Sequence, residues 1–381
     1  MRPTLVAPCV LSLSALWVAG CGGGGDAAPA ASSKADDAAL VAAPALTPFP
    51  DSLPAAGSGG MCTVPQDAQL VNTSSPTTVV GDGTVASCTS AAVVQAVAKG
   101  GVITFNCGAA PVTITLAATA KVFNNQPDVV LDGGGKVTLS GGGVRRVLYQ
   151  NTCDQAQVWT SPRCDLQTNP TLTLQRITLA DGNATGQTYG QGAEGGGALF
   201  VRGGRVRIIN SRFFSNTSEL TGPDLGGGAV RLFGTQQALV VGSTFGGDAT
   251  HGNTSSNGGA ISTLGASLGI YNSMLSHNQA LGTGANPARD GTLGGGSGGA
   301  IYQDGNAFSL SVCGSTVQNN RANEGGSAVI FVSNNSTGTM SLTDSSFSGH
   351  PKGTFETPGL PGFFIKAAAG QPVLTNTTIV R

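Results

Sequence analysis

Residues 206–213 read Val-Arg-Ile-Ile-Asn-Ser-Arg-Phe, with apolar residues at Val206, Ile208 and Phe213 and a small residue at Ser211. This apolar-x-apolar-x-x-small-x-apolar pattern recurs down the last two-thirds of the chain, with spacings of 34, 32, 30, 42, 30 and 32 residues between successive last positions. A period of this size is typical of a solenoid, a propeller or a repeat array. The seven copies are Leu172-Leu174-Ile177-Leu179, Val206-Ile208-Ser211-Phe213, Ala238-Val240-Ser243-Phe245, Leu268-Ile270-Ser273-Leu275, Leu310-Val312-Ser315-Val317, Met340-Leu342-Ser345-Phe347 and Pro372-Leu374-Thr377-Ile379.

A second motif accompanies the first: a Gly-rich turn that leads into a short apolar strand. Glycine permits a positive-φ corner, and alanine leaves room where the backbone turns inward. Each repeat therefore predicts about three short strands, which gain stability by pairing with their copies in the next repeat. The copies are Gly196-Gly197-Ala198-Leu199-Phe200, Gly227-Gly228-Ala229-Val230-Arg231, Gly258-Gly259-Ala260-Ile261-Ser262, Gly298-Gly299-Ala300-Ile301-Tyr302 and Gly326-Ser327-Ala328-Val329-Ile330.

One clear helix signal precedes the repeats. Residues 89–98 place four apolar side chains on one face, Ser87, Thr89 or Ser90 can cap the start, and Gly100 follows the end. Two β-branched stretches at 102–105 and 112–116 follow as predicted strands. A short amphipathic helix at this place is suited to cover the first turn of a solenoid.

The composition limits the possible partners. The chain has 381 residues, 59 glycines and a formal net charge of −1. Without a basic patch, we expect no nucleic-acid partner. Nor do we expect a cofactor or a metal, since no Cys-x-x-Cys or Cys/His cluster is present.

The N-terminus predicts export. Arg2 precedes a largely apolar stretch that is too short to span a membrane. The following Val-Ala-Gly-Cys run, ending at Cys21, resembles the lipobox of bacterial lipoproteins. The resemblance implies a signal peptide at 1–20, acylation of Cys21 and, because Gly22 rather than Asp follows, a lipid anchor in the outer membrane. An ordinary secretory signal with an incidental cysteine is the alternative.

The Gly-Gly-Ala turn and the apolar-x-apolar-x-Asn-Ser-x-Phe segment resemble right-handed parallel β-helix proteins of the pectin-lyase-like superfamily. They are especially similar to polymorphic outer-membrane adhesins with Gly-Gly-Ala-Ile repeats. The resemblance implies an all-β chain with an N-terminal cap and short helix at 61–110 and a right-handed parallel β-helix at 111–381. The Gly-, Ala-, Ser- and Pro-rich composition ahead of the cap, without periodicity, predicts a flexible tether at 21–60. This fold hosts lyases, hydrolases, adhesins and inert spacers, so it does not fix an activity.

The chain has eight cysteines, of which Cys9 lies in the predicted signal peptide and Cys21 is the predicted acylation site. The other six belong to the folded part, and export permits them to form disulfides. Cys153 and Cys164 flank a short loop, which favours a local disulfide. Cys88 and Cys107 flank the predicted helix and the strand after it. Cys62 and Cys313 would be the remaining pair, but nothing in the sequence places them together.

The 42-residue spacing marks an insertion loop at 281–299 that contains Arg289 and Asp290. Long loops on a rigid stack often carry binding function. We expect the loops at 180–197 and 215–228 to emerge on the same side and to form a groove with it. Glu194, Asp224, Asp290 and Glu324 recur on this edge, where carboxylates are also possible Ca²⁺ ligands, although the nine-residue calcium repeat is absent.

Outside these loops the sequence shows little chemistry. Five arginines alternate with apolar residues and predict an outward basic ridge, either a solvated face or a surface for acidic polysaccharide. We expect the three histidines, His251, His277 and His350, in solvent-exposed turns. The five arginines are Arg202, Arg205, Arg207, Arg212 and Arg231.

Two hypotheses follow. The first is a non-enzymatic surface lipoprotein that binds carbohydrate or a cell-surface protein, favoured because acid clusters and aromatic sugar platforms are not evident in the sequence. The second is a polysaccharide lyase or hydrolase with a divergent site on the loop face. Three or more acids, or acids and an arginine, converging in a groove would favour the second hypothesis.

We predict that Cys21→Ser prevents acylation, because the hydroxyl cannot replace the thiol that receives the lipid. The variant precursor should be soluble or uncleaved, which membrane fractionation and metabolic labelling with a fatty acid will measure. Normal fractionation of the variant with the membrane would reject the lipobox interpretation.

Overall fold

The computed structural model describes residues 62–158, 160–187 and 194–381. The predicted signal peptide, Cys21 and the tether lie outside the described residues. None of the helices in these ranges is long and apolar enough to span a membrane.

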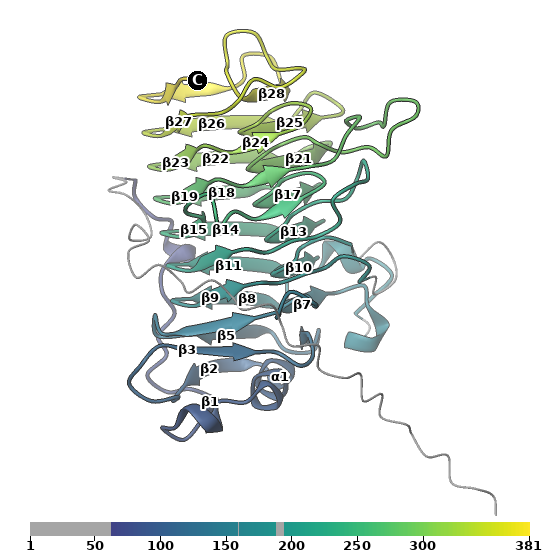
Figure 1. Cartoon of the computed structure of the whole chain (residues 1–381). Coiled ribbons are helices and arrows are strands. Elements are labelled where there is room, and N and C mark those ends of the chain that lie inside the picture. The colour runs from purple at the N-terminus through teal and green to yellow at the C-terminus, as the bar shows by residue number, and fades with distance from the viewer. Residues whose placement is uncertain (1–61, 159, 188–193) are drawn as a thin grey trace, which may run out of the picture. The chain divides into compact units, whose positions relative to one another are not determined.

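The described chain winds into a right-handed parallel β-helix, which confirms the predicted fold class. Successive strands pass from sheet A to sheet B to sheet C and then return to sheet A one turn later, so that each sheet extends along the stack (Figure 1). Every pairing between strands of these three sheets is parallel, as a stack of successive turns requires. A small fourth sheet, D, lies at the corner between sheets B and C.

The strands are short, from two to five residues each. Sheet A contains β1 (Thr78–Val80), β2 (Gly101–Phe105), β5 (Asp128–Asp132), β8 (Thr171–Gln175), β11 (Arg205–Ile209), β14 (Gln237–Val241), β18 (Leu268–Tyr271), β22 (Ser309–Cys313), β26 (Thr339–Thr343) and β29 (Val373–Thr375). Sheet B contains β3 (Val112–Thr115), β6 (Val137–Ser140), β9 (Thr178–Ala180), β12 (Arg212–Phe214), β15 (Thr244–Gly246), β19 (Met274–Ser276), β23 (Thr316–Gln318), β27 (Ser346–Ser348) and β30 (Thr378–Ile379). Sheet C contains β4 (Ala120–Val122), β7 (Leu148–Asn151), β10 (Leu199–Arg202), β13 (Val230–Phe233), β17 (Ile261–Leu264), β21 (Ile301–Gly305), β25 (Val329–Ser333) and β28 (Phe363–Lys366). Sheet D contains β16 (Thr254–Ser255), β20 (Gln279–Ala280) and β24 (Arg321–Ala322). The helices are α1 (Ser90–Lys99) and the 3₁₀ helices η1 (Gln66–Ala68), η2 (Val85–Ser87), η3 (Gln155–Gln157) and η4 (Cys164–Leu166).

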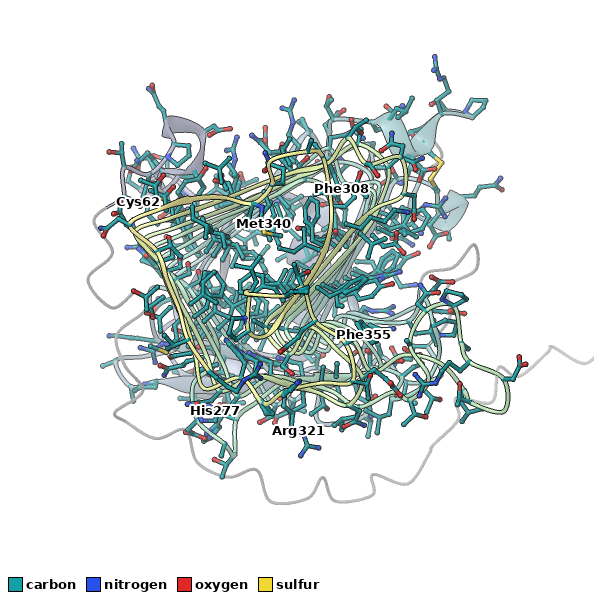
Figure 2. The ribbon with its side chains drawn as sticks, turned by 90° about the horizontal axis from the view of Figure 1, so that it is seen from above. Cys62, His277, Phe308, Arg321, Met340 and Phe355 are labelled. Carbon is teal, nitrogen blue, oxygen red and sulfur yellow. A yellow bond between two sulfur atoms is a disulfide. The ribbon has the colours of Figure 1, made fainter. Side chains whose placement is uncertain are left out.

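The repeated apolar positions form the core in the first six copies, whereas Leu374 of the last copy is exposed at the C-terminal end of the stack. In the copy that defines the pattern, Val206 and Ile208 of β11 and Phe213 of β12 are buried, and the equivalent residues of neighbouring turns pack above and below them. The view along the stack in Figure 2 shows Met340, another member of this set, inside the turn. The alternation that the sequence shows thus separates an inward row from an outward row on each strand.

The small position of the pattern is a serine ladder. The backbone N–H of Ser211 donates to the hydroxyl of Ser243 at 3.0 Å, and the N–H of Ser243 donates to Ser273 at the same distance. The ladder continues through Ser315 and Ser345. Each hydroxyl therefore satisfies a buried N–H at the corner between sheets A and B.

The first glycine of each Gly-Gly-Ala motif has the positive φ that the sequence predicts, for example 74° at Gly227 and 71° at Gly298. A Cβ at Gly227 would lie 2.2 Å from the carbonyl oxygen of Val230. The corner into sheet C therefore requires glycine for both conformation and space.

Helix α1 covers the N-terminal end of the core. The hydroxyl of Thr89 accepts a hydrogen bond from the N–H of Ala92, and Gly100 ends the helix with φ 75°. Val93, Ala96 and Val97 are buried in the main core cluster. The predicted helix and its role as a cap are confirmed.

The segment 62–77, here called the N-terminal strap, crosses the outer face of sheet A. A disulfide joins Cys62 to Cys313 on β22, the backbone of Val71 exchanges two hydrogen bonds with the side chain of Gln175, and Thr77 donates to Val102. The strap thus runs back along the stack from β22 to β2.

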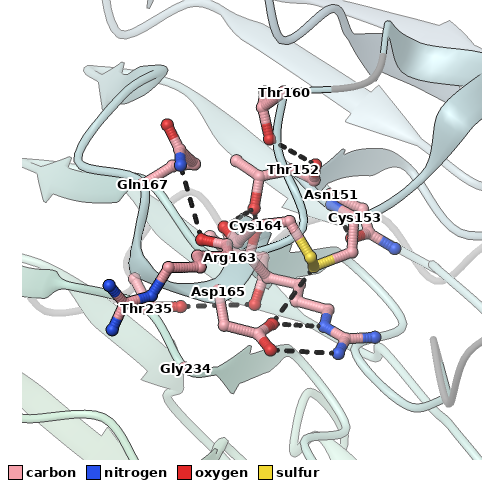
Figure 3. Close-up of polar contacts among 12 residues, drawn as sticks. Asn151, Thr152, Cys153, Thr160, Arg163, Cys164, Asp165, Gln167, Gly234 and Thr235 are labelled. Carbon is pink, nitrogen blue, oxygen red and sulfur yellow. Dashed lines mark hydrogen bonds and ion pairs between the residues drawn. A yellow bond between two sulfur atoms is a disulfide. The ribbon is translucent and has the colours of Figure 1, made fainter.

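The other two disulfides match the predicted pairs. Cys88 is bonded to Cys107, and Cys153 is bonded to Cys164. The second pair closes a loop beside sheet C, where the carboxylate of Asp165 also binds Arg202 at 2.7 Å (Figure 3).

We predict that Phe213→Asp destabilises the stack, because Phe213 is fully buried and lies 4.6 Å, centroid to centroid, from Phe245. Burying an unpaired charge should lower the free energy of unfolding by about 3 kcal/mol or more. The melting temperature should fall by roughly 5 °C or more, as followed by circular dichroism. Arg212→Asp introduces the same side chain at the adjacent outward position and should change little; equal effects of the two variants would reject the inward assignment.

Candidate functional site

The outer face of sheet C carries a continuous row of side chains that point away from the core. They are the fifth residues of the Gly-Gly-Ala motifs and their equivalents on the flanking strands, and they lie in register from turn to turn. The row contains Tyr149, Phe200, Arg231, Ser262, Tyr302, Ile330 and Phe364.

A cleft of about 370 Å³ lies over the C-terminal part of this row. Tyr302, Ile330 and Phe364 contribute to its floor, and Asp304 and Val332 come from the next outward position of the same strands. The insertion loop forms one wall and Phe355 another, so that the cleft is bounded by both regular strands and loops. The complete lining is Ala285, Asn286, Pro287, Ser297, Tyr302, Asp304, Ile330, Val332, Asn334, Phe355 and Phe364.

Three aromatic side chains line the cleft. Phe355 and Phe364 pack edge to face with centroids 5.0 Å apart, and both remain partly exposed. Tyr302 is buried beneath the insertion loop. The sequence, with two tryptophans, does not predict an aromatic platform, whereas the fold gathers one from three separate segments.

A chain of hydrogen bonds runs along the cleft. The side-chain amide of Asn286 donates to the carboxylate of Asp224 at 2.9 Å and to the hydroxyl of Tyr302 at 2.8 Å. That hydroxyl donates to Asp304 at 3.3 Å, and the amide of Asn334 donates to the other carboxylate oxygen at 2.9 Å. Burial, and secondarily the charge of Asp304, raises the pKa of Tyr302. The hydroxyl therefore stays protonated and keeps its place in the chain.

Arg231 lies next to this network and is buried. Its guanidinium donates to the hydroxyl of Ser262 and to the backbone carbonyl of Asp224. Burial lowers the pKa of Arg231, while Asp224, Asp304 and Glu194 act in the opposite direction. Acidic groups and an arginine do converge beside the cleft, which is the arrangement that favours the enzymatic hypothesis.

Glu324 anchors the insertion loop. Its buried carboxylate accepts two hydrogen bonds of 2.8 Å from Arg289 and one of 2.7 Å from the N–H of Gly284. These bonds, that of Arg289 above all, lower the pKa of Glu324 from 4.5 to about 2. Because the pKa is depressed in the folded state, the anchoring is complete above the ordinary pKa and is lost as the pH falls toward 2.

The structure brings the predicted loops together but separates their predicted acids. The N–H of Gly222 donates to the carbonyl of Gly294, and that of Gly196 donates to Gly226, so the three loops do emerge on one side. Asp224 joins the cleft network, Glu194 is half-buried near Arg231, and Asp290 is exposed. In the part of the chain that the structure describes, the four carboxylates do not share a metal-sized site.

The predicted basic ridge is wrong. Arg205 and Arg207 lie on sheet A, Arg212 lies on sheet B, and Arg202 and Arg231 lie on sheet C. Arg231 is buried and Arg202 pairs with Asp165. The alternation correctly predicts that these side chains point outward. Successive strands of one turn belong to different sheets, however, so the five arginines lie on three different faces of the stack and form no single ridge.

The expected exposure of the histidines is also wrong for two of them. His251 is buried and pairs with Asp248 at 2.8 Å. His350 is 1% exposed, its ring nitrogens lie 3.2 and 3.1 Å from the carbonyl oxygens of Asn320 and Val317, and its burial lowers its pKa. Both fill corners of the stack, and neither lies in the cleft.

Comparison of the chain with protein-family models, with curated proteins and with solved structures gives no match.

We predict that Arg289→Ala loosens the insertion loop, because the buried carboxylate of Glu324 loses its bidentate partner. Amide hydrogen exchange across 283–296 should become roughly tenfold faster, measured by mass spectrometry. Arg321→Ala removes an exposed arginine of β24 and serves as the control. Unchanged exchange in Arg289→Ala would mean that the ion pair does not hold the loop.

Proposed function

We propose that this chain is a surface-binding protein whose sheet C cleft holds a segment of carbohydrate. The observation that carries the proposal is that one cleft is lined both by aromatic residues and by polar side chains that hydrogen bonds connect through the Tyr302 hydroxyl; the residues are Tyr302, Phe355, Phe364, Asn286, Asp304 and Asn334. Pyranose rings present apolar C–H faces and hydroxyl edges, so a site that combines aromatic faces with carboxylates and amides suits them. The cleft volume is in the range of small-molecule sites.

The rigid stack supports this proposal. The floor of the cleft comes from β21, β25 and β28, which are hydrogen bonded to one another in continuous register. Asn286 on the insertion loop is itself held by Asp224 and Tyr302. A binding surface that is ordered before the ligand arrives loses less conformational entropy on binding.

We also propose that the protein is an outer-membrane lipoprotein of the pectin-lyase-like type. The support is the Val-Ala-Gly-Cys run ending at Cys21 and the likeness of the repeats to those of β-helical adhesins. A lipid anchor and a tether at 21–60 would present the cleft to glycans of the periplasm or of a neighbouring surface.

A second candidate function is a polysaccharide hydrolase or lyase. The observation in its favour is the convergence of Asp224, Asp304 and Arg231 beside the cleft. Binding is the better supported function, because the groups that catalysis would need are already engaged. The carboxylates of Asp224 and Asp304 accept hydrogen bonds from the side-chain amides of Asn286 and Asn334, and the guanidinium of Arg231 is buried.

We predict that the full-length protein, purified in mild detergent, binds oligosaccharides on a glycan array and by calorimetry. Phe364→Ala should weaken binding about tenfold, because it removes an exposed stacking surface. Tyr271→Ala, on the outer face of sheet A, is the matched control. Absence of binding to every glycan would reject the proposal, and release of shorter or unsaturated products would favour the enzymatic candidate.

A further inference from the structure

The charge of the cleft decides which saccharides can enter. In the described ranges of the chain, Asp304 is the one cleft-lining residue with a charged side chain, and Asp224 lies directly behind the amide of Asn286. Among the described residues, no lysine, arginine or histidine lies within ion-pair distance of either carboxylate. The buried Arg231 interacts electrostatically with Asp224, Asp304 and Glu194, so one positive charge is set against three negative ones and a ligand in the cleft meets net negative charge.

The basic groups nearby are not available to a ligand. Arg231 is 5% exposed and donates to Ser262 and to a backbone carbonyl. Arg289 is occupied by Glu324. Lys366 is exposed two strands from Asp304 in the same outward row, and it does not line the cleft.

The hydrogen-bond directions lead to the same conclusion. The amide of Asn286 donates both of its protons within the protein, the hydroxyl of Tyr302 donates its own to Asp304, and Asn334 donates one of its two. The polar atoms that remain for a ligand are therefore mainly hydrogen-bond acceptors, namely the carboxylate of Asp304 and the side-chain amide oxygens of Asn286 and Asn334. A ligand carboxylate or sulfate, which only accepts, would find few donors beyond the second amide proton of Asn334 and would be repelled by Asp304.

We infer that the cleft selects saccharides that are rich in hydrogen-bond donors and carry no anionic group, namely neutral or amino-substituted hexose chains. The inference depends on the proposed carbohydrate-binding function. It differs from the expectation of an acidic polysaccharide held by an arginine ridge, since that ridge does not form.

The test uses oligomers of equal length made of galactose, glucosamine or galacturonate. Calorimetry measures the dissociation constant of each oligomer for the full-length protein in mild detergent. At low salt, the neutral or the amino oligomer should bind at least roughly tenfold more tightly than the uronate. Raising the salt concentration screens the repulsion and should strengthen uronate binding. This salt series uses the wild-type protein and does not depend on any variant.

Asp304→Asn keeps the shape of the side chain and removes its charge. The difference in affinity between the neutral and the uronate oligomer should therefore become smaller in this variant. Asp128→Asn makes the same change at an exposed position on β5 and should leave the preference intact. Uronate binding as tight as neutral binding, or a preference unaffected by Asp304→Asn, would overturn the inference while leaving carbohydrate binding in place. Absence of binding to all three oligomers would instead contradict the proposed function.

Discussion

Strands of two to five residues form no sheet within their own turn, and each one here, except those at the ends of a sheet, is hydrogen bonded to the strands one turn above and one turn below. The corners obey the same constraint. The side chains of Asn216, Asn253, Asn278 and Asn320 are fully buried, and each amide oxygen after the first accepts hydrogen bonds from the asparagine of the preceding turn, with side-chain distances of 2.8–2.9 Å. Together with the serine ladder, they satisfy polar groups that a turn on its own would leave unpaired inside the molecule.

This dependence of each turn on its neighbours divides the residues between packing and recognition. Inward positions such as Phe213 are fixed by the turns on either side, and corner positions by the ladders. The outward row of sheet C contributes neither to the central core nor to the ladders, although most of its side chains, such as Tyr149 and Arg231, are buried. The insertion loop and Phe355 enclose the C-terminal part of the row. The cleft therefore forms where segments outside the regular repeat close over this row.

The sequence predicts the fold well because its two periods, of 2 along a strand and of about 32 between turns, are visible in residues such as Ile208 and Val240. It could also have indicated the floor of the cleft, since Tyr302 occupies the fifth, outward position of a Gly-Gly-Ala motif. Phe355 could not be found in this way, because it lies in a segment outside the repeat. The buried guanidinium of Arg231 donates to the hydroxyl of Ser262 in the next turn, and the Cys62–Cys313 disulfide joins residues 251 positions apart. Contacts of these kinds appear only once the turns are stacked.

The Cys62–Cys313 disulfide has a mechanical consequence. Cys313 ends β22, and the preceding strand of the same turn, β21, carries Tyr302 and Asp304. Tension applied to the chain ahead of Cys62, with a ligand held in the cleft, has a short covalent path through the disulfide and the backbone between Cys313 and Tyr302. This path bypasses the backbone of the turns from β1 to β18.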